Sequence, residues 1–290
     1  MKRTCIQFLA TTALLLLATN AQATISCNVS SPGFTTSYDP AAVSQTIVQT
    51  NLTATCVRGQ GTDPTTLTYS VGVDNGAYFS AGSNRAKLTT GASYVQYDLY
   101  SNSLCTNLWR TSPSAKRLPV PGTGTMTLSG FISTSVVTTY WGCIPAGQTG
   151  QPAGIYLDTV PMTLYDGNSN TAIAPISSIP VAIFMSATCN ISTAPGVITF
   201  NYTSFGPAIN PTTTFGATCT SLLPYTMALD VTSGALLGLN YSLALSAASS
   251  TGTGVQQTHT ITGTMAAGQA GTCAVGTCSA SQMHALTITY

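Results

Sequence analysis

Short stretches in which apolar and polar residues alternate run along most of the chain. The clearest are TIVQTNLTATCV (46–57), TLTYSVGVD (66–74), YVQYDLY (94–100) and DTVPMTLY (158–165). A period of two, with enrichment in Thr, Val and Tyr, indicates β-strands that bury one face. Turn clusters such as GQGTDP and DNGA separate them, and no window keeps a helical period. We therefore predict an all-β fold, an immunoglobulin-like antiparallel β-sandwich, with a β-barrel as the alternative.

The alternating pattern occurs twice, which predicts two homologous domains. ISCNVSSPG (25–33) recurs as ATCNISTAPG (187–196), and LTATCV (52–57) recurs as FGATCT (215–220). Later blocks follow in the same order, and the first copy carries an additional segment before its AGQ block. The predicted domains span residues 24–165 and 188–290, with 166–187 between them.

The N-terminal residues have the features of a secretory signal. Lys2 and Arg3 precede an apolar run, residues 8–18, that is too short to span a bilayer, and Ala-Gln-Ala at 21–23 fits the cleavage rule. We predict a signal peptide over 1–23, with an uncleaved anchor as the alternative. The predicted mature protein is exported.

Charge is scarce in the rest of the chain. Charged residues make up 5% of the whole sequence, and outside the signal six basic residues face seven Asp and no Glu. A nucleic-acid partner is disfavoured because there is no basic stripe to neutralise phosphates. An enzyme is disfavoured as well, because neither His259 nor His284 lies in a Ser/His/Asp or paired-carboxylate motif.

Eight cysteines remain outside the signal, and an even number in an exported chain indicates disulfides. A metal site is disfavoured because the sequence has two histidines and no pair of CxxC motifs, and no cofactor is expected. The repeat predicts one equivalent bridge early in each domain, and the remaining cysteines then pair within their domains, although the sequence leaves this second connectivity open. The predicted pairs are Cys27–Cys56 and Cys189–Cys219 from the repeat, and Cys105–Cys143 and Cys273–Cys278 from the remainder.

Two segments of domain 1 carry a resemblance to a known family. WGCIPAGQTGQPAGIYLDTVPMTLY (141–165) resembles the signature of the spore coat protein U domain family, YGRIPAGQ followed by AGxYxDTVxVTVxY. YDLYSNSLCTNLW (97–109) resembles its LYxDxxxTxxW segment. Cys143 stands where the motif has Arg and Cys105 interrupts the second segment; because both departures occur together, they support a bridge between the two. Domain 2 is a shorter, diverged copy.

The resemblance implies an assembly function. Members of the family are similar to subunits of archaic chaperone–usher pili, immunoglobulin-like folds that lack their last strand. A periplasmic chaperone fills the gap first and a strand of the adjacent pilin fills it later. The resemblance thus implies a chaperone, an outer-membrane usher and a neighbouring pilin as partners. Two-domain members resemble tip adhesins at the cell surface.

The two ends of the sequence suggest where such a subunit stands. Three residues between the predicted cleavage site and Cys27 are too few for a donor strand. The sequence stops at Tyr290, which aligns with Tyr165 at the end of the sixth strand of domain 1. We therefore expect domain 2 to lack its last strand, to accept one from a neighbour, and to place the protein at the pilus tip.

Residues 166–187, DGNSNTAIAPISSIPVAIFMSA, follow Tyr165 in domain 1. Four apolar residues there alternate like a strand with one buried face: Ile179, Val181, Ile183 and Met185. We hypothesise that this segment supplies the missing strand of domain 1 within the same chain. The alternative is a linker followed by the first strand of domain 2.

Four aromatic residues are candidates for contact with a surface. Phe34, Tyr38, Tyr78 and Phe79 fall in 33–45 and 74–84, which we expect, with 146–154, to be loops at the end of domain 1 far from domain 2. Exposed aromatic loops suit hydrophobic adhesion to an abiotic or host surface; the alternative is that these residues plug the end of the sandwich. The predicted function is a pilus-tip adhesin. The alternatives are a structural minor pilin or coat protein without a receptor, and a carbohydrate lectin.

Overall fold

The computed structural model describes residues 25–120 and 122–290, so the expected signal peptide lies outside the described residues. These residues fold into β-strands with one short 3-10 helix, η1 (Ser114–Lys116). None of the helical structure in this part of the chain is long and apolar enough to cross a membrane.

Domain 1 is built from ten strands. They are β1 (Ser26–Ser30), β2 (Phe34–Tyr38), β3 (Thr46–Val57), β4 (Thr66–Val73), β5 (Asn84–Leu88), β6 (Tyr94–Tyr100), β7 (Gly124–Thr127), β8 (Thr134–Ile144), β9 (Gly154–Asp166) and β10 (Ser177–Met185).

The strands of domain 1 form two layers that share one strand. In one layer, neighbouring strands follow the order β1-β3-β8-β6. In the other layer, β9 pairs with β4 and β10, and β10 pairs with β2. β5 pairs with both β6 and β9, so hydrogen bonds connect the two layers along one side. The domain is thus a sandwich closed on that side.

Alternation along the strands sets the core of domain 1. On β9, Tyr156, Val160, Met162 and Leu164 face inward and are buried, while the residues between several of them reach solvent. Trp109, from the segment between β6 and η1, is fully buried against Tyr140. Burying large apolar side chains is the main favourable term in folding, so these positions stabilise the sandwich.

Domain 2 has eight strands in two sheets. They are β11 (Cys189–Thr193), β12 (Thr212–Cys219), β13 (Pro224–Leu229), β14 (Ser233–Leu236), β15 (Leu239–Leu245), β16 (Ser249–Thr251), β17 (Gln256–Met265) and β18 (Leu286–Thr289). The sheets have the orders β11-β12-β17-β15-β14 and β16-β13-β18. Around a few buried residues such as Phe215 and Ile261, many apolar side chains of this domain are only half-buried.

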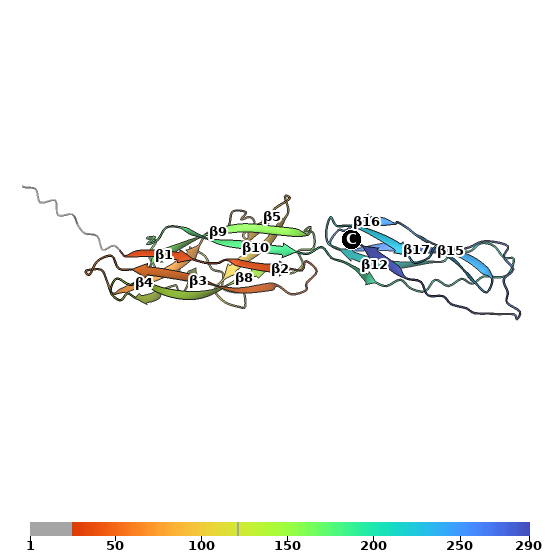
Figure 1. Ribbon diagram of the computed structural model, residues 1–290, viewed down its shortest axis with the longest axis horizontal. Coiled ribbons are helices and arrows are strands. Elements are labelled where there is room, and N and C mark those ends of the chain that lie inside the picture. The colour runs from red at the N-terminus through yellow and green to blue at the C-terminus, as the bar shows by residue number, and fades with distance from the viewer. Residues whose placement is uncertain (1–24, 121) are drawn as a thin grey trace, which may run out of the picture.

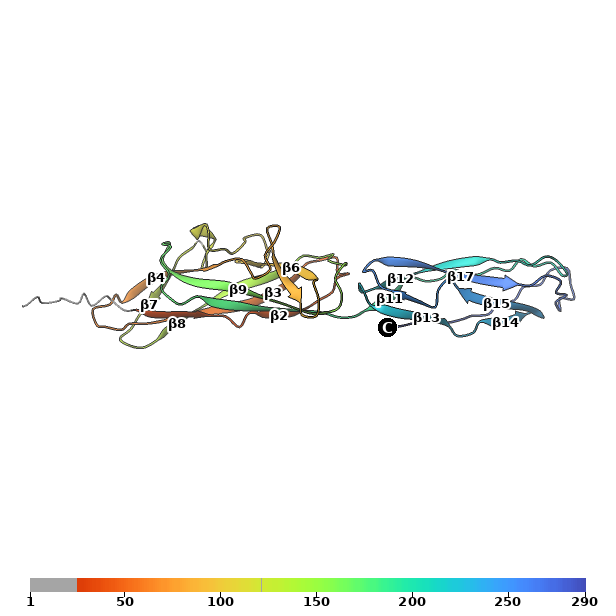
Figure 2. The ribbon, with the colours of Figure 1, turned by 90° about the horizontal axis from the view of Figure 1, so that it is seen from above.

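The two domains lie end to end in an elongated molecule (Figures 1 and 2). The β10 strand ends at Met185 and β11 begins at Cys189, so the connection is short. Pro152 of domain 1 forms a parallel bridge with Ser221 of domain 2. Gly254 lies so close to the Thr149 carbonyl that a Cβ atom there would overlap it.

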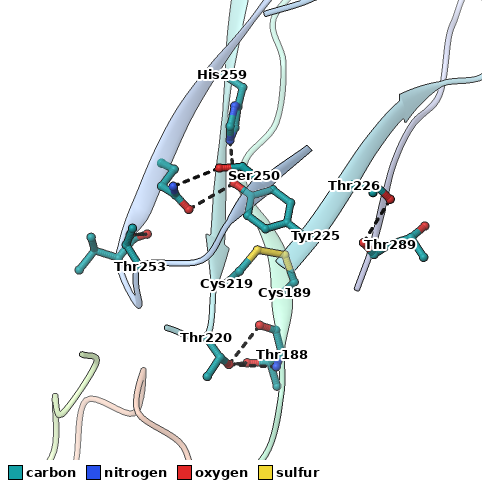
Figure 3. Close-up of a disulfide and its surroundings, with 12 residues drawn as sticks. Thr188, Cys189, Cys219, Thr220, Tyr225, Thr226, Ser250, Thr253, His259 and Thr289 are labelled. Atoms are coloured by element: carbon teal, nitrogen blue, oxygen red, sulfur yellow. Dashed lines mark hydrogen bonds between the residues drawn. A yellow bond between two sulfur atoms is a disulfide. The ribbon is translucent and has the colours of Figure 1, made fainter. Parts of the chain in front are cut away.

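Residues 25–290 contain four disulfides, in the pairs given above: Cys27–Cys56, Cys105–Cys143, Cys189–Cys219 and Cys273–Cys278. The first and third join directly opposite residues of β1–β3 and β11–β12. Figure 3 shows Cys189–Cys219 between a Thr188–Thr220 hydrogen bond and the buried Tyr225–His259 pair.

Candidate functional site

Two of the four candidate surface aromatics are buried, so their expected exposure is wrong. Phe34 and Tyr38 lie on β2, with 4% and 2% of their surfaces exposed. The Phe34 ring packs edge-on against Tyr97, with centroids 5.7 Å apart. The Tyr38 hydroxyl donates a hydrogen bond to the Pro145 carbonyl. Both side chains face inward because β2 pairs with β10 as a short edge strand, where a loop was expected.

Tyr78 and Phe79 lie on the flank of domain 1, between β4 and β5. Tyr78 is 36% exposed and packs against Tyr94, whereas Phe79 is half-buried. The Ala77 amide donates to the Thr159 carbonyl, which places the pair beside the middle of β9. This position is on the side of the sandwich and not at its end.

The expected orientation of domain 1 is also wrong. Residues 146–154 contact domain 2 through Thr149 and Pro152, and residues 39–45 lie at the same end because β2 runs parallel to β10. The β9 strand runs away from domain 2 and β10 returns to it (Figure 1). The end away from domain 2, which we call the distal end, is therefore formed by residues 58–65, 128–133 and 167–172.

The distal end carries two exposed apolar side chains that the sequence analysis missed. Phe131 is 64% exposed and Ile132 is 73% exposed, in the loop between β7 and β8. The loop is fixed at its start because the Leu128 amide donates to the Thr65 carbonyl and the Leu128 side chain is buried. The sequence signal that could have identified these two side chains is SGFIS (129–133), an apolar pair within a serine- and glycine-rich connection.

The β10 strand fills a position between β9 and β2. It pairs antiparallel with β9 over nine residues and parallel with β2 over five. Its four alternating side chains point into the core of domain 1 and are at most 3% exposed: Ile179, Val181, Ile183 and Met185.

The glutamine of the first AGQ block acts as an extra strand residue beside β6. The Gln148 side chain accepts a hydrogen bond from the Gln96 amide (2.7 Å) and donates one to the Gln96 carbonyl (3.0 Å). It also donates to the Pro145 carbonyl at 3.2 Å. The Gln148 backbone amide donates to the Tyr38 hydroxyl, which explains why Tyr38 is held inside.

The second AGQ block repeats this arrangement in domain 2. Gln269 exchanges the same two hydrogen bonds with Asn240 on β15, donates to the Ala266 carbonyl, and its backbone amide donates to the Tyr202 hydroxyl. Tyr202 is thus the counterpart of Tyr38. The segment 198–202 therefore occupies the position that β2 occupies in domain 1.

The position that β10 fills in domain 1 has no strand in domain 2 among the described residues. β18 pairs with β13 on one side, and no described strand pairs with its other side. Residues 198–202 form no strand. The apolar residues that flank this position are half-buried: Ile198, Phe200, Leu286 and Ile288.

A buried carboxylate holds the flank of domain 1 in place. Asp158, on the inward face of β9, accepts hydrogen bonds from the Tyr97 hydroxyl (2.7 Å) and the Ala77 amide (3.0 Å). Burial raises the pKa of Asp158, with its hydrogen bonds opposing the shift. Burial and the neighbouring Asp158 raise the pKa of Tyr97. These bonds fix the turn that carries Tyr78 against β9.

Domain 2 contains a chain of polar contacts that the sequence did not indicate. His284 Nδ1 lies 3.2 Å from Asp230 Oδ1, and its Nε2 lies 2.6 Å from the Tyr241 hydroxyl. The Tyr241 hydroxyl donates its hydrogen bond to Gln282 Oε1. These contacts tie the segment before β18 to β15 and the end of β13. In the described residues, no three His, Cys, Asp or Glu side chains are grouped to hold a metal ion.

Comparison with protein families gives one match. The Spore Coat Protein U domain model matches residues 11–163, just over half of the chain. The chain belongs to the Spore Coat Protein U domain family. The matched part of this Spore Coat Protein U domain protein ends within β9 and so includes the AGQ block at 146–148. No curated protein matches the sequence significantly.

Several solved structures resemble this Spore Coat Protein U domain protein at low identity. The tip adhesion subunit CsuE of Acinetobacter baumannii Csu pili, solved with CsuC, aligns at 11% identity over 91% of this chain and 100% of that chain, with a TM-score of 0.44. The CupB6 tip adhesin of Pseudomonas aeruginosa aligns at 10% identity over 92% and 94%, with a TM-score of 0.39. The CooA pilin of Escherichia coli aligns at 12% identity over 56% and 97%, with a TM-score of 0.32.

Proposed function

We propose that this protein is the tip subunit, an adhesin, of a chaperone–usher pilus and joins the fibre by accepting a strand in domain 2. One observation carries the proposal. The place between β9 and β2 is filled by the chain's own β10, whereas the equivalent place beside β18 has no strand among the described residues. Domain 1 is then complete, with β10 as an internal donor, and domain 2 is an acceptor.

The half-buried apolar side chains of domain 2 are suited to contact an incoming strand that has alternating apolar residues. Ile198, Phe200, Leu286 and Ile288 flank the open place and pack against an incompletely covered core. An unpaired edge also offers backbone groups for main-chain hydrogen bonds. A periplasmic chaperone would fill the place first, and the adjacent pilin would fill it after assembly through the outer-membrane usher.

A variant that carries its own donor tests the acceptor proposal. A copy of residues 166–185 is appended after Tyr290, because in domain 1 the same residues follow Tyr165 and lead into β10. We expect slower amide hydrogen exchange in β13 and β18 and a higher melting temperature. The control copy carries Ser at its four alternating apolar positions. If both copies protect β18 equally, or neither does, domain 2 is not an acceptor of this kind.

For the adhesive end, we propose the distal loop 128–133 in place of the loops suggested by the sequence. Phe131 and Ile132 are exposed at the end farthest from the acceptor, where a tip subunit meets an abiotic or host surface. Exposed apolar side chains on a short fixed loop suit hydrophobic contact. In this proposal the protein is localised at the pilus tip on the cell surface.

Attachment of piliated cells to plastic tests the adhesive end. The double variant Phe131→Ser, Ile132→Ser should lose most retention while pili remain visible by electron microscopy. The matched control Tyr78→Ser, Phe79→Ser removes two aromatic rings from the flank and should retain attachment. Immunogold labelling should mark only the fibre ends. Labelling along the shaft, or loss of pili in the first variant, would favour the structural minor pilin instead.

A further inference from the structure

Two cations on the flank of domain 1 have no acidic partner. Arg85 and Lys87 alternate on β5 with the buried Asn84, Ala86 and Leu88, so both point outward on one face. Among the described residues, Arg110 forms an ion pair with Asp98. Neither Arg85 nor Lys87 lies within 4.0 Å of a carboxylate there. What sets them apart is that they project from one strand, on the same face and two residues apart.

Aromatic rings and a backbone carbonyl hold these cations in position. The Arg85 guanidinium stacks over the Tyr94 ring, 4.4 Å from its centroid, and Arg85 Nε donates to the Tyr78 carbonyl at 2.8 Å. The ammonium of Lys87 lies 5.6 Å from the centroid of Tyr78. A guanidinium oriented by stacking keeps its two terminal nitrogens available as a fork that matches a carboxylate.

An open hollow of about 490 Å³ lies next to the Arg85 side chain. It separates the β5–β6 hairpin from the segment after the AGQ block, and its lining includes Arg85, Ser93, Tyr94, Gln96, Thr149 and Gln151. The amide of Gln148 is fully used within the fold, but the side chains of Gln96 and Gln151 make no hydrogen bond to other described residues. The hollow therefore offers free amides and hydroxyls beside a fixed cation.

We propose that this hollow binds an acidic polysaccharide, through a uronate-type sugar whose carboxylate pairs with Arg85, which lines the hollow, and with Lys87, which lies outside the lining on the same face of β5. The amides and hydroxyls of the lining would hydrogen-bond the sugar hydroxyls, and Tyr78 would contact the apolar face of a ring. The volume far exceeds that of a free carboxylate, and two cations are too few for a nucleic-acid backbone. The site lies apart from the distal loop, toward the end of domain 1 where Thr149 contacts domain 2.

Titration of the full exported chain with a mannuronate hexamer, followed by calorimetry, tests this site. The probe variant is Arg85→Gln, Lys87→Gln. The matched control is Arg58→Gln, Lys116→Gln, which removes the same charge elsewhere in domain 1. We expect at least tenfold weaker binding in the probe variant, about 1.4 kcal/mol, and less than a twofold change in the control. Raising the salt should weaken wild-type binding, because the carboxylate contact is exposed to screening.

The other outcomes overturn the proposal. If the two double variants lose hexamer binding equally, the net charge of the protein alone attracts the hexamer. A neutral glucose hexamer that binds as well as the uronate would remove the role of the carboxylate. No binding of the hexamer by the wild-type chain would exclude the site directly. Unchanged near-ultraviolet circular dichroism in both variants establishes that a loss of binding is not a loss of folding.

Discussion

Replacing one side chain of β10 should unfold domain 1 far more readily than replacing its neighbour. Ile183 is fully buried in the core of domain 1, whereas Phe184, on the other face of the same strand, is 38% exposed. Ile183→Ala removes buried carbon atoms and leaves a cavity, which costs about 2–5 kcal/mol. Phe184→Ala removes a larger side chain but leaves no enclosed cavity, so we expect a cost below about 1 kcal/mol.

Tryptophan fluorescence in urea measures this difference in domain 1 alone, because the chain has two tryptophans, Trp109 and Trp141, and both lie there. With an m-value of about 2 kcal/mol per M, Ile183→Ala should lower the urea midpoint by about 1–2.5 M. Phe184→Ala should shift it by less than about 0.5 M. If Ile183→Ala leaves the tryptophan midpoint unchanged, or if the two variants shift it equally, β10 is not part of the domain 1 core.

Three further changes test individual contacts. Gln148→Ala should lower the stability of domain 1 by about 1–2 kcal/mol in the same assay, because it removes the side-chain bonds to β6; Gln269→Ala should leave the tryptophan transition unmoved. Because the folded-state pKa of Asp158 is raised, the wild-type protein should lose stability as pH rises above the ordinary value of 3.8. In Asp158→Asn, the urea midpoint should no longer fall as pH rises above 3.8. If it falls as in the wild type, Asp158 is not the group responsible. Gly254→Ala should break the contact with Thr149 and broaden the interdomain distances measured between spin labels, one in each domain; an unchanged distribution would mean that the junction does not depend on this contact.

Alternation and the repeat predicted a large part of the fold because both are local signals. The spacing of Ile179, Val181, Ile183 and Met185 indicated a strand with one buried face, and the structure places that strand in domain 1. By contrast, β2 is a short strand of mostly polar residues, FTTSY, that pairs in parallel with a segment far along the chain. Nothing local distinguishes it from a loop, and Phe34 and Tyr38 were therefore misplaced.

The orientation of domain 1 was inferable but was assigned wrongly. If residues 177–185 lie antiparallel to β9 and then enter domain 2, β9 must run away from domain 2. The loops expected at the distal end, including 146–154, must then face the junction. The role of Gln148 could not be foreseen, since its hydrogen bonds join it to Gln96, which is remote in sequence. The repeated AGQ block showed that a glutamine recurs but not what it contacts.

The short connection between β10 and β11 has a mechanical consequence. Residues 186–188 are all that separate the two strands, so tension applied to domain 2 reaches the C-terminal end of β10 along its own axis. The hydrogen bonds to β9 and β2 then carry the load together, in shear, and cannot open one after another. To yield, β10 would have to slide its four buried side chains through the core at once. In the proposed fibre, a pull against an attached surface would therefore load this strand in shear.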